Sequence, residues 1–326
     1  MFENVSRRNV MALGVGAAVG LGLSSVKAPA FAKEPKLHAQ APYWYRFNVG
    51  DAEITIVSDG WQMLGDPSKS FLGSKEEVRK ELTDNFMNPS DMNIELNSFV
   101  VNMNGKLVLF DTGLGYSKMF GQKGGLLLKN LASAGIKAEN IDAVVISHGH
   151  IDHIGGIVDE HGALNYPNAQ VYISQADLDY WTDEKQMNAP WKKGFITHAR
   201  NNLLPVRDRI VFFKDQQEFL PGITAMSAPG HTIGHTMFNI QSNGQSFIFV
   251  GDVSHHSVLL IQNPRMEFLY DADSKQAVET RLKMLDYLST NRIPILAYHF
   301  SWPGYGHFLK QGEGYRYLPA PMNMNL

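Results

Sequence analysis

Short runs of alternating hydrophobic and polar residues recur along the chain and predict a protein rich in β-strands. Some of these runs stand in pairs around two-residue turns, at Gly50-Asp51, Asn104-Gly105 and Asn243-Gly244. Asn-Gly favours the type I′ turn of a tight hairpin, because both of its residues readily adopt positive φ. Hairpins are therefore expected at 45–58, 98–111 and 236–252, and single strands at 142–147, 169–174, 209–213, 223–227 and 293–299.

Helical signals lie between the predicted strands. Ser74 and Glu77 have the spacing of a capping box, which predicts a helix that begins there and ends near Phe86. Hydrophobic residues at helical spacing predict further helices at 126–135 and 273–289. No repeat or long linker interrupts residues 33–326, which are expected to form one domain. Strand hairpins interleaved with helices predict an α/β fold, in which two packed sheets are covered by helices.

The composition limits the chemistry that the chain can perform. Its 326 residues are 44% hydrophobic and 19% charged, which suits one large globular domain or two small ones with a substantial core. The formal net charge is -3 and no stretch is rich in Lys or Arg, so nucleic acid is a poor fit as a partner. The sequence contains no cysteine, which rules out disulfides, thiolate metal ligands and thiol nucleophiles. Catalysis or metal binding must therefore use histidine, carboxylate or hydroxyl groups.

Residues 1–32 have the features of a twin-arginine export signal. Arg7-Arg8 precede a weakly hydrophobic, glycine-rich run, and Ala30-Phe31-Ala32 offers a cleavage site. The apolar run 10–26 would span about 25 Å as a helix, less than the roughly 30 Å of hydrocarbon in a bilayer. We therefore expect cleavage after Ala32, export to the periplasm or beyond, and no stable membrane anchor in the mature chain. A permanent N-terminal anchor is the alternative.

The stretch SHGHIDHIGG, residues 147–156, concentrates metal-binding side chains in one short segment. It follows a predicted buried strand and ends in two glycines, which places it in a strand-to-helix loop, where catalytic residues are common. His148 and His150 are two residues apart, and Asp152 and His153 follow directly, so one loop can direct two donors to each of two points. The spacing predicts a paired metal site. The alternative is a set of hydrogen-bonded structural histidines.

Further donors follow predicted strands elsewhere, at His231, Asp252 and His299. With the first loop they complete the pattern of the metallo-β-lactamase superfamily, which this sequence resembles. The resemblance implies an αββα sandwich with two zinc ions per chain, held by His148, His150 and His231 at the first ion, by Asp152, His153 and His299 at the second, and by Asp252 as a bridge. Imidazole and carboxylate suit Zn²⁺, and they also suit Mn²⁺, Fe²⁺ or Co²⁺.

Two metal ions would give the site a hydrolytic role. A water held between them loses a proton near neutral pH, and the resulting hydroxide attacks a substrate whose oxygen one metal polarises. Asp152 and Asp252 are therefore expected to be catalytic residues as well as ligands. The motif FDTG places Asp111 where the superfamily has an acceptor that orients the ligand loops, with simple turn formation as the alternative. His235 is expected to support its own loop.

Three stretches narrow the resemblance: YRFNVGDAEITIVSDG, KLVLFDTG and HFSWPGYGHFLKQGEGYRYLP. They are similar to the methyl parathion hydrolase group, periplasmic enzymes that cleave organophosphate triesters and related esters and lactones. By position, Phe120, Trp181 and Phe195 resemble the aromatic residues around the leaving group in these enzymes, with core packing as the alternative. A homodimer is also implied. His255 stands where the group has an apolar residue, which favours a lactone or aryl ester over a phosphotriester as substrate.

Other activities of the superfamily fit the sequence less well. The commonest dizinc β-lactamases use a cysteine ligand, which this chain lacks. A tRNA-processing nuclease would carry a basic arm, and a redox diiron protein would have a carboxylate in place of His150. A glyoxalase-type thioesterase shares all the ligands and stays an alternative, as does a non-catalytic zinc-binding protein. The expected function is metal-dependent hydrolysis of a small neutral ester, lactone or organophosphate triester.

Overall fold

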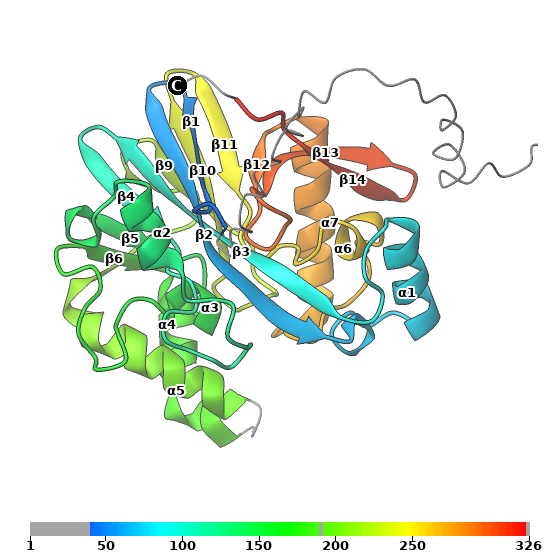
Figure 1. Cartoon of the computed structure of the whole chain (residues 1–326), viewed down its shortest axis with the longest axis horizontal. Helices are drawn as coiled ribbons and strands as arrows, with labels where there is room; N and C mark the ends of the chain where they lie inside the picture. Colours follow the sequence, from blue (N-terminus) through cyan, green and yellow to red (C-terminus); the bar gives the residue numbers. More distant parts are fainter. Residues whose placement is uncertain (1–39, 189–191, 324–326) are drawn as a thin grey trace, which may run out of the picture. The chain divides into compact units, whose positions relative to one another are not determined.

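Two β-sheets form the centre of the fold (Figure 1). The computed structural model describes residues 40–188 and 192–323, so the expected export signal lies outside the described residues. The first sheet has seven strands in sequence order: β1 (Trp44–Val49), β2 (Ala52–Gly65), β3 (Met92–Met103), β4 (Lys106–Phe110), β5 (Ala143–Val145), β6 (Gln170–Ile173) and β7 (Ile210–Phe212). The second has seven in reverse order: β14 (Gly314–Pro319), β13 (Tyr305–Gln311), β12 (Ile295–Leu296), β11 (Gln245–Phe249), β10 (Thr236–Ser242), β9 (Ile223–Ser227) and β8 (Glu218–Leu220).

Helices cover the outer faces of the sheets. In the described residues they are α1 (Lys75–Asp84), α2 (Leu127–Ser133), α3 (Ile151–Ile154), α4 (Gln175–Thr182), α5 (Lys192–Leu203), α6 (Leu259–Gln262) and α7 (Ser274–Thr290). α2 packs on β2 of the first sheet, and α7 packs on β13 of the second. Leu285 and Leu288 of α7 share a buried cluster with Ile248 and Ile295 of the second sheet. The layers are those of the expected αββα sandwich.

The two Asn-Gly turns form as the sequence predicts. Asn104 and Gly105 have φ of 55° and 71°, and Asn243 and Gly244 have φ of 43° and 75°. Both central residues of each turn therefore have the positive φ that a type I′ turn requires. The turns join β3 to β4 and β10 to β11 as antiparallel hairpins.

The remaining element predictions are correct where the local signal is strong. Ser74 and Glu77 form the predicted capping box, and α1 begins directly after it. α4 and α5 were not predicted, although Ser174 caps the start of α4. β12 is also shorter than expected, with only two residues.

Aromatic side chains from both sheets fill the space between them. Phe99 and Phe110 of the first sheet stack with ring centroids 4.3 Å apart, and Phe249 of the second sheet meets Phe99 edge-on at 5.0 Å. All three are fully buried, and burial of each such side chain stabilises the fold by about 1.5–3 kcal/mol. This packing fixes the strand ends relative to one another, and the strand ends carry the candidate site.

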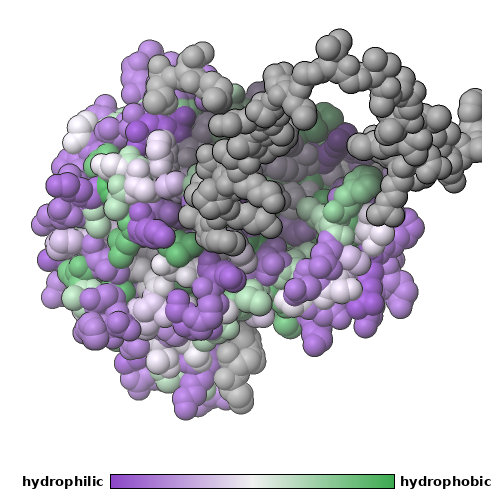
Figure 2. All heavy atoms as spheres, in the orientation of Figure 1, coloured by the Kyte–Doolittle hydropathy of each residue, from purple (hydrophilic) through white to green (hydrophobic). Residues whose placement is uncertain are grey.

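The surface has a polar region over α1. Figure 2 shows hydrophilic side chains gathered there, in agreement with the charged sequence KEEVRKELTD. Val78 and Leu82 of the same helix are buried, so α1 is amphipathic. Within the described part of the chain, no helix is both long and apolar enough to cross a membrane.

Candidate metal centre

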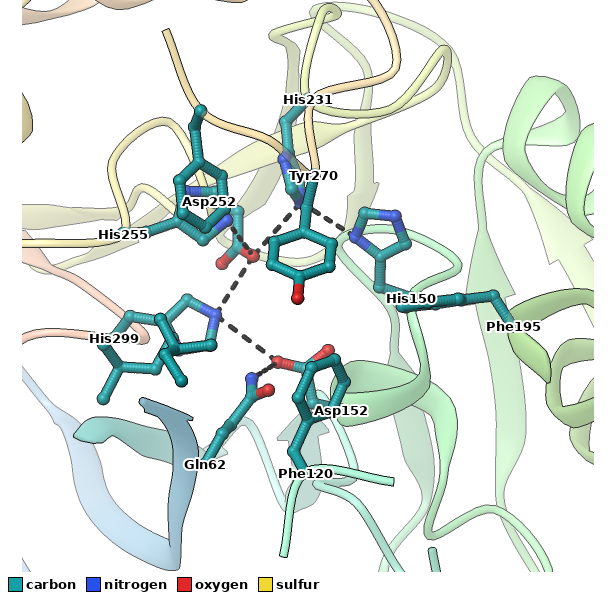
Figure 3. Close-up of a pocket in the computed structure, with 13 residues that line it drawn as sticks. Gln62, Phe120, His150, Asp152, Phe195, His231, Asp252, His255, Tyr270 and His299 are labelled. Carbon is teal, nitrogen blue, oxygen red and sulfur yellow. Dashed lines mark hydrogen bonds and ion pairs between the residues drawn. The ribbon is translucent and has the colours of Figure 1, made fainter. Parts of the chain in front are cut away.

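Loops that follow the strands bring the predicted ligands together (Figure 3). Each ligand comes after a strand: His148, His150, Asp152 and His153 after β5, His231 after β9, Asp252 after β11 and His299 after β12. All of them are buried. Asp152 and His153 lie in α3 itself, so only the two preceding histidines belong to the loop. The residues thus form one cluster, and their role as ligands stays a prediction.

Three imidazole nitrogens face one another at the first predicted site. His150 Nδ1 lies 3.1 Å from His148 Nε2 and 2.9 Å from His231 Nε2. The second ring nitrogen of His148 and of His231 has a partner elsewhere. His148 Nδ1 lies 3.1 Å from Ser147 Oγ, and His231 Nδ1 donates to Asp271 Oδ1 at 2.9 Å. In the neutral form each of these imidazoles has one N–H, so the nitrogens that face His150 would then carry lone pairs. Converging lone pairs of this kind fit a divalent cation.

The second predicted site contains Asp152, His153 and His299. Asp152 Oδ2 lies 3.5 Å from His153 Nε2 and 3.4 Å from His299 Nε2. His153 Nδ1 donates to Asp111 Oδ2 at 2.8 Å, and His299 Nδ1 donates to Glu95 O at 2.9 Å. His153 Nε2 is buried and has no hydrogen-bond partner among the described residues. An unpaired buried nitrogen beside a carboxylate oxygen is costly, and a bound cation would satisfy both atoms.

Asp252 lies between the two predicted sites. Its Oδ2 is 3.0–3.6 Å from imidazole nitrogens of His255, His299, His153, His231 and His148. Burial opposes ionisation of this carboxyl, but the surrounding imidazoles, with the largest effect from His299, hold its pKa well below the usual range. Asp252 is therefore ionised at neutral pH, as a bridging ligand must be.

The protonation of the histidines also fits a metal site. Burial lowers the pKa of His148 and His150 well below the usual value, which keeps both rings neutral. For His231, burial opposes the charge, but Asp252 and Asp271 together raise its pKa to about 9. A divalent cation would replace that proton beside Asp252. Several groups of three described residues have donor atoms that all lie within 4.8 Å of one another. Two of these groups are the predicted ligand triads.

Asp111 connects the start of the ligand loop to its end. It follows β4 in a left-handed conformation, with φ of 54°. Its carboxylate accepts hydrogen bonds from Ser147 N at 2.8 Å, from Ser147 Oγ at 2.7 Å and from His153 Nδ1 at 2.8 Å. These contacts orient the His153 ring toward the second site, the kind of role that the sequence predicts for Asp111.

His235 supports Asp252 and not only its own loop. Asp252 N donates to His235 Nε2 at 2.9 Å, so His235 Nδ1 carries the ring proton and donates to Ala228 O at 3.0 Å. Burial lowers the pKa of His235 to about 3, which keeps this neutral tautomer. His235 therefore holds the backbone of Asp252 in place.

A buried ion pair that no sequence motif marks holds His231. Asp271 accepts from His231 Nδ1, and its Oδ2 lies 3.6 Å from Arg281 Nη2. Arg281, on α7, is also buried and donates to the backbone carbonyls of Val253, Pro264 and Met266. One arginine thus connects the loop after Asp252 with the segment that carries Asp271.

Replacing Asp271 with alanine should weaken metal binding at the first site. His231 would lose the acceptor that selects its tautomer, and residues in this role contribute roughly 10- to 100-fold to metal affinity. Competition with a coloured chelator measures the change. Asp273→Ala is the matched control: Asp273 caps α7, so its loss should lower stability by about 1 kcal/mol and leave metal affinity unchanged. Equal affinities in the two variants would contradict the role of Asp271.

Asp177, on α4, joins the two loops of the first site. This buried carboxylate accepts from Gly149 N at 2.7 Å, from Thr232 Oγ1 at 2.8 Å and from Gly234 N at 2.6 Å. Gly149 separates His148 from His150, and Thr232 and Gly234 follow His231. Asp177 therefore keeps the first ligand loop close to His231, although α4 itself was not predicted.

A cavity with aromatic walls lies over the ligand cluster (Figure 3). Phe120, Phe195 and His255, which the sequence places near the substrate, line this cavity. Trp181 is not among the lining residues: it is 1% exposed and packs behind His150, with ring centroids 4.7 Å apart. The structure corrects the expected position of Trp181, because its ring fills the space beside Gly149 and not the cavity.

Comparison with known proteins identifies the family. A sequence model of the metallo-beta-lactamase superfamily matches residues 96–294. The chain belongs to this superfamily. Among solved structures, AidC, a dizinc quorum-quenching lactonase, is 29% identical, with a TM-score of 0.81 over 86% of this chain and 98% of AidC. AbOPH, a hydrolase of the β-lactamase superfamily, is 28% identical, with a TM-score of 0.81 over 87% of this chain and 100% of AbOPH.

Curated relatives match only in part. Hydroxyacylglutathione hydrolase of Hyphomonas neptunium is 32% identical over 127 residues, which are 31% of this chain and 47% of that protein. The chain spans between about a quarter and a half of the length of the curated relatives that it matches. The match to the family model and the observed fold confirm the predicted superfamily and fold. The narrower likeness to methyl parathion hydrolases stays a prediction, as do export and dimerisation.

Proposed function

We propose that the chain is a dinuclear zinc hydrolase of small neutral esters and lactones, with organophosphate triesters as poorer substrates. The cavity is the observation that carries this proposal. Members of both predicted metal sites line it beside Phe120, Phe195, Phe268 and Tyr270, and no Lys or Arg is among its described lining residues. A cavity of this kind favours a neutral substrate with apolar parts over an anionic one.

The residues of the cavity suit hydrolysis. Zinc ions bound there would supply a Lewis acid for the ester carbonyl and a water of lowered pKa. Burial opposes ionisation of Asp152, but His153 and His299 lower its pKa to about 2, so the carboxylate is charged at neutral pH. Asp111 and Asp271 orient the rings of His153 and His231. The aromatic walls exclude water from the apolar part of a substrate.

A lactone substrate has support from a neighbour and from His255. AidC, at 29% identity, is a lactonase in complex with its product. In this chain, His255 Nε2 lies 3.0 Å from Asp252 Oδ2, and its ring stacks on Phe268 with centroids 4.0 Å apart. A polar ring thus occupies part of the wall where an aryl phosphotriester needs apolar contact.

Metal analysis and a substrate panel test the proposal. The purified mature protein should contain about two zinc ions per chain, and should hydrolyse dihydrocoumarin and p-nitrophenyl acetate faster than methyl parathion. Preference for S-lactoylglutathione would identify a glyoxalase-type thioesterase, and zinc binding without hydrolysis would identify a non-catalytic zinc-binding protein. Full activity in metal-free protein would overturn the proposal.

Replacing His255 with leucine should raise phosphotriester turnover relative to lactone turnover. The ratio should change about tenfold if roughly 1.4 kcal/mol of transition-state binding is redistributed. Parallel kinetics on dihydrocoumarin and methyl parathion measure it. His256→Leu is the control, because this neighbouring buried histidine does not line the cavity. Loss of zinc and of both activities in His255→Leu would instead make His255 a ligand, as its grouping with His231 and Asp252 permits.

A further inference from the structure

The short segment Phe268–Asp271 forms one wall of the cavity. Phe268 stacks on His255, and Asp271 accepts the hydrogen bond from His231. Backbone hydrogen bonds fix the segment, since Leu269 N donates to Ser70 O at 2.8 Å and Leu72 N donates to Glu267 O at 2.9 Å. Tyr270 lies between the two contact residues, so its position is set from both sides.

The Tyr270 ring is held among aromatic side chains. Its centroid lies 5.4 Å from that of Phe268, 6.0 Å from that of Phe120 and 6.4 Å from that of Phe195. Figure 3 shows the hydroxyl directed into the space between His150 and Asp152. The apolar part of the ring therefore packs against the wall, and its one polar group faces the predicted metal ligands.

The hydroxyl of Tyr270 keeps its proton at neutral pH. Burial raises its pKa, and the charge of Asp152 raises it further. Ser70 acts in the opposite direction, but the pKa of the phenol stays above its usual value. The protonated hydroxyl points into the cavity, where it can donate to a bound molecule (Figure 3).

Other polar groups on the cavity wall are directed at the predicted ligands. The Gln62 side-chain amide donates to Asp152 Oδ2, and His255 Nε2 faces Asp252 Oδ2. The Tyr270 hydroxyl is placed differently, because it lies across the cavity from Gln62 and points into the space beside the ligands (Figure 3). A substrate carbonyl held over the predicted metal sites would lie within its reach.

We propose that Tyr270 is a catalytic residue whose hydroxyl donates a hydrogen bond to the substrate oxygen that gains negative charge during hydrolysis. The proposal rests on the proposed function. The hydroxyl keeps its proton throughout, so no bond to hydrogen forms or breaks at Tyr270. A preorganised donor of this kind acts mainly on the transition state, because the charge on the oxygen is largest there.

Tyr270→Phe tests this role, because it removes the hydroxyl and leaves the ring. On dihydrocoumarin, kcat should fall about 10²-fold, with little change in KM and unchanged zinc content. Tyr166→Phe is the matched control: Tyr166 is buried and does not line this cavity, and its hydroxyl has no hydrogen-bond partner among the described residues. Its kcat should equal that of the wild type.

A binding experiment separates this proposal from the proposed function. Phenylphosphonate offers a tetrahedral oxyanion with an aromatic ring, and calorimetry on zinc-loaded protein should show about tenfold weaker binding to Tyr270→Phe than to the wild type. Wild-type protein that hydrolyses no ester or lactone, but binds the probe in this hydroxyl-dependent way, would refute the proposed function and still show that Tyr270 donates to a tetrahedral oxyanion in the cavity. Unchanged kcat and unchanged probe affinity in Tyr270→Phe would overturn the inference.

Discussion

Asp252→Ala should lose metal and activity together. The Asp252 carboxylate lies 3.0–3.6 Å from five imidazole nitrogens and contacts residues of both predicted sites. Its removal would leave those imidazoles facing one another without the anion that attracts two cations. We expect kcat/KM on dihydrocoumarin to fall by more than the roughly 10- to 100-fold that is typical of residues which only orient a ligand. Elemental analysis of the purified variant should show at most about one zinc ion per chain, roughly half the wild-type content.

The matched control is Asp286→Ala, an exposed aspartate on α7. It should keep both zinc and activity, since surface substitutions usually change stability by less than about 0.5 kcal/mol. His148→Ala tests the first site separately and should also lose metal, whereas the exposed His161→Ala should not. Wild-type zinc content in Asp252→Ala would show that Asp252 does not bridge the ions.

The sequence predicted the parts of the fold that are determined within a few residues. Each Asn-Gly turn forms because its two residues adopt positive φ. The cap at Ser74 forms through hydrogen bonds with Glu77 alone. α4 and α5 depend more on contacts that are distant in sequence. Trp181 of α4 packs on His150, and Phe195 of α5 contacts the same ring. Such helices have a weaker local signal, and they were missed.

The predicted ligands were found for a related reason. Four of them are almost adjacent in one short segment, and the others follow hydrophobic runs that are recognisable as strands. The residues that hold the ligands carry no comparable signal. Asp271 is 40 residues from His231, and Asp177 is 28 residues from Gly149. They meet their partners only when the sheets pack, so a single sequence gives no reason to select them from the other aspartates.

Trp181 was expected in the substrate pocket, and its actual position makes Gly149 a sensitive residue. An alanine Cβ at position 149 would lie 2.3 Å from Trp181 Cδ1 and 2.7 Å from its Cγ. The loop cannot simply move away, because Gly149 N donates to Asp177 Oδ2 at 2.7 Å. Trp181 cannot move easily either, since it is 1% exposed and fully packed. The indole therefore sets the spacing between His148 and His150.

Gly149→Ala should lower stability by about 1–3 kcal/mol, the usual cost of overpacking a core, and should weaken zinc binding at least tenfold, because both flanking histidines shift. Denaturant unfolding and chelator competition measure the two effects. Trp181→Ala alone should also destabilise the protein, by leaving a cavity. In the double variant the alanine at position 181 lacks the Cγ and Cδ1 atoms that the new methyl group would meet, so the two stability losses should not add, and zinc affinity should recover in part. Additive losses with no recovery would mean that the methyl group acts through the backbone of the loop and not through the contact with Trp181.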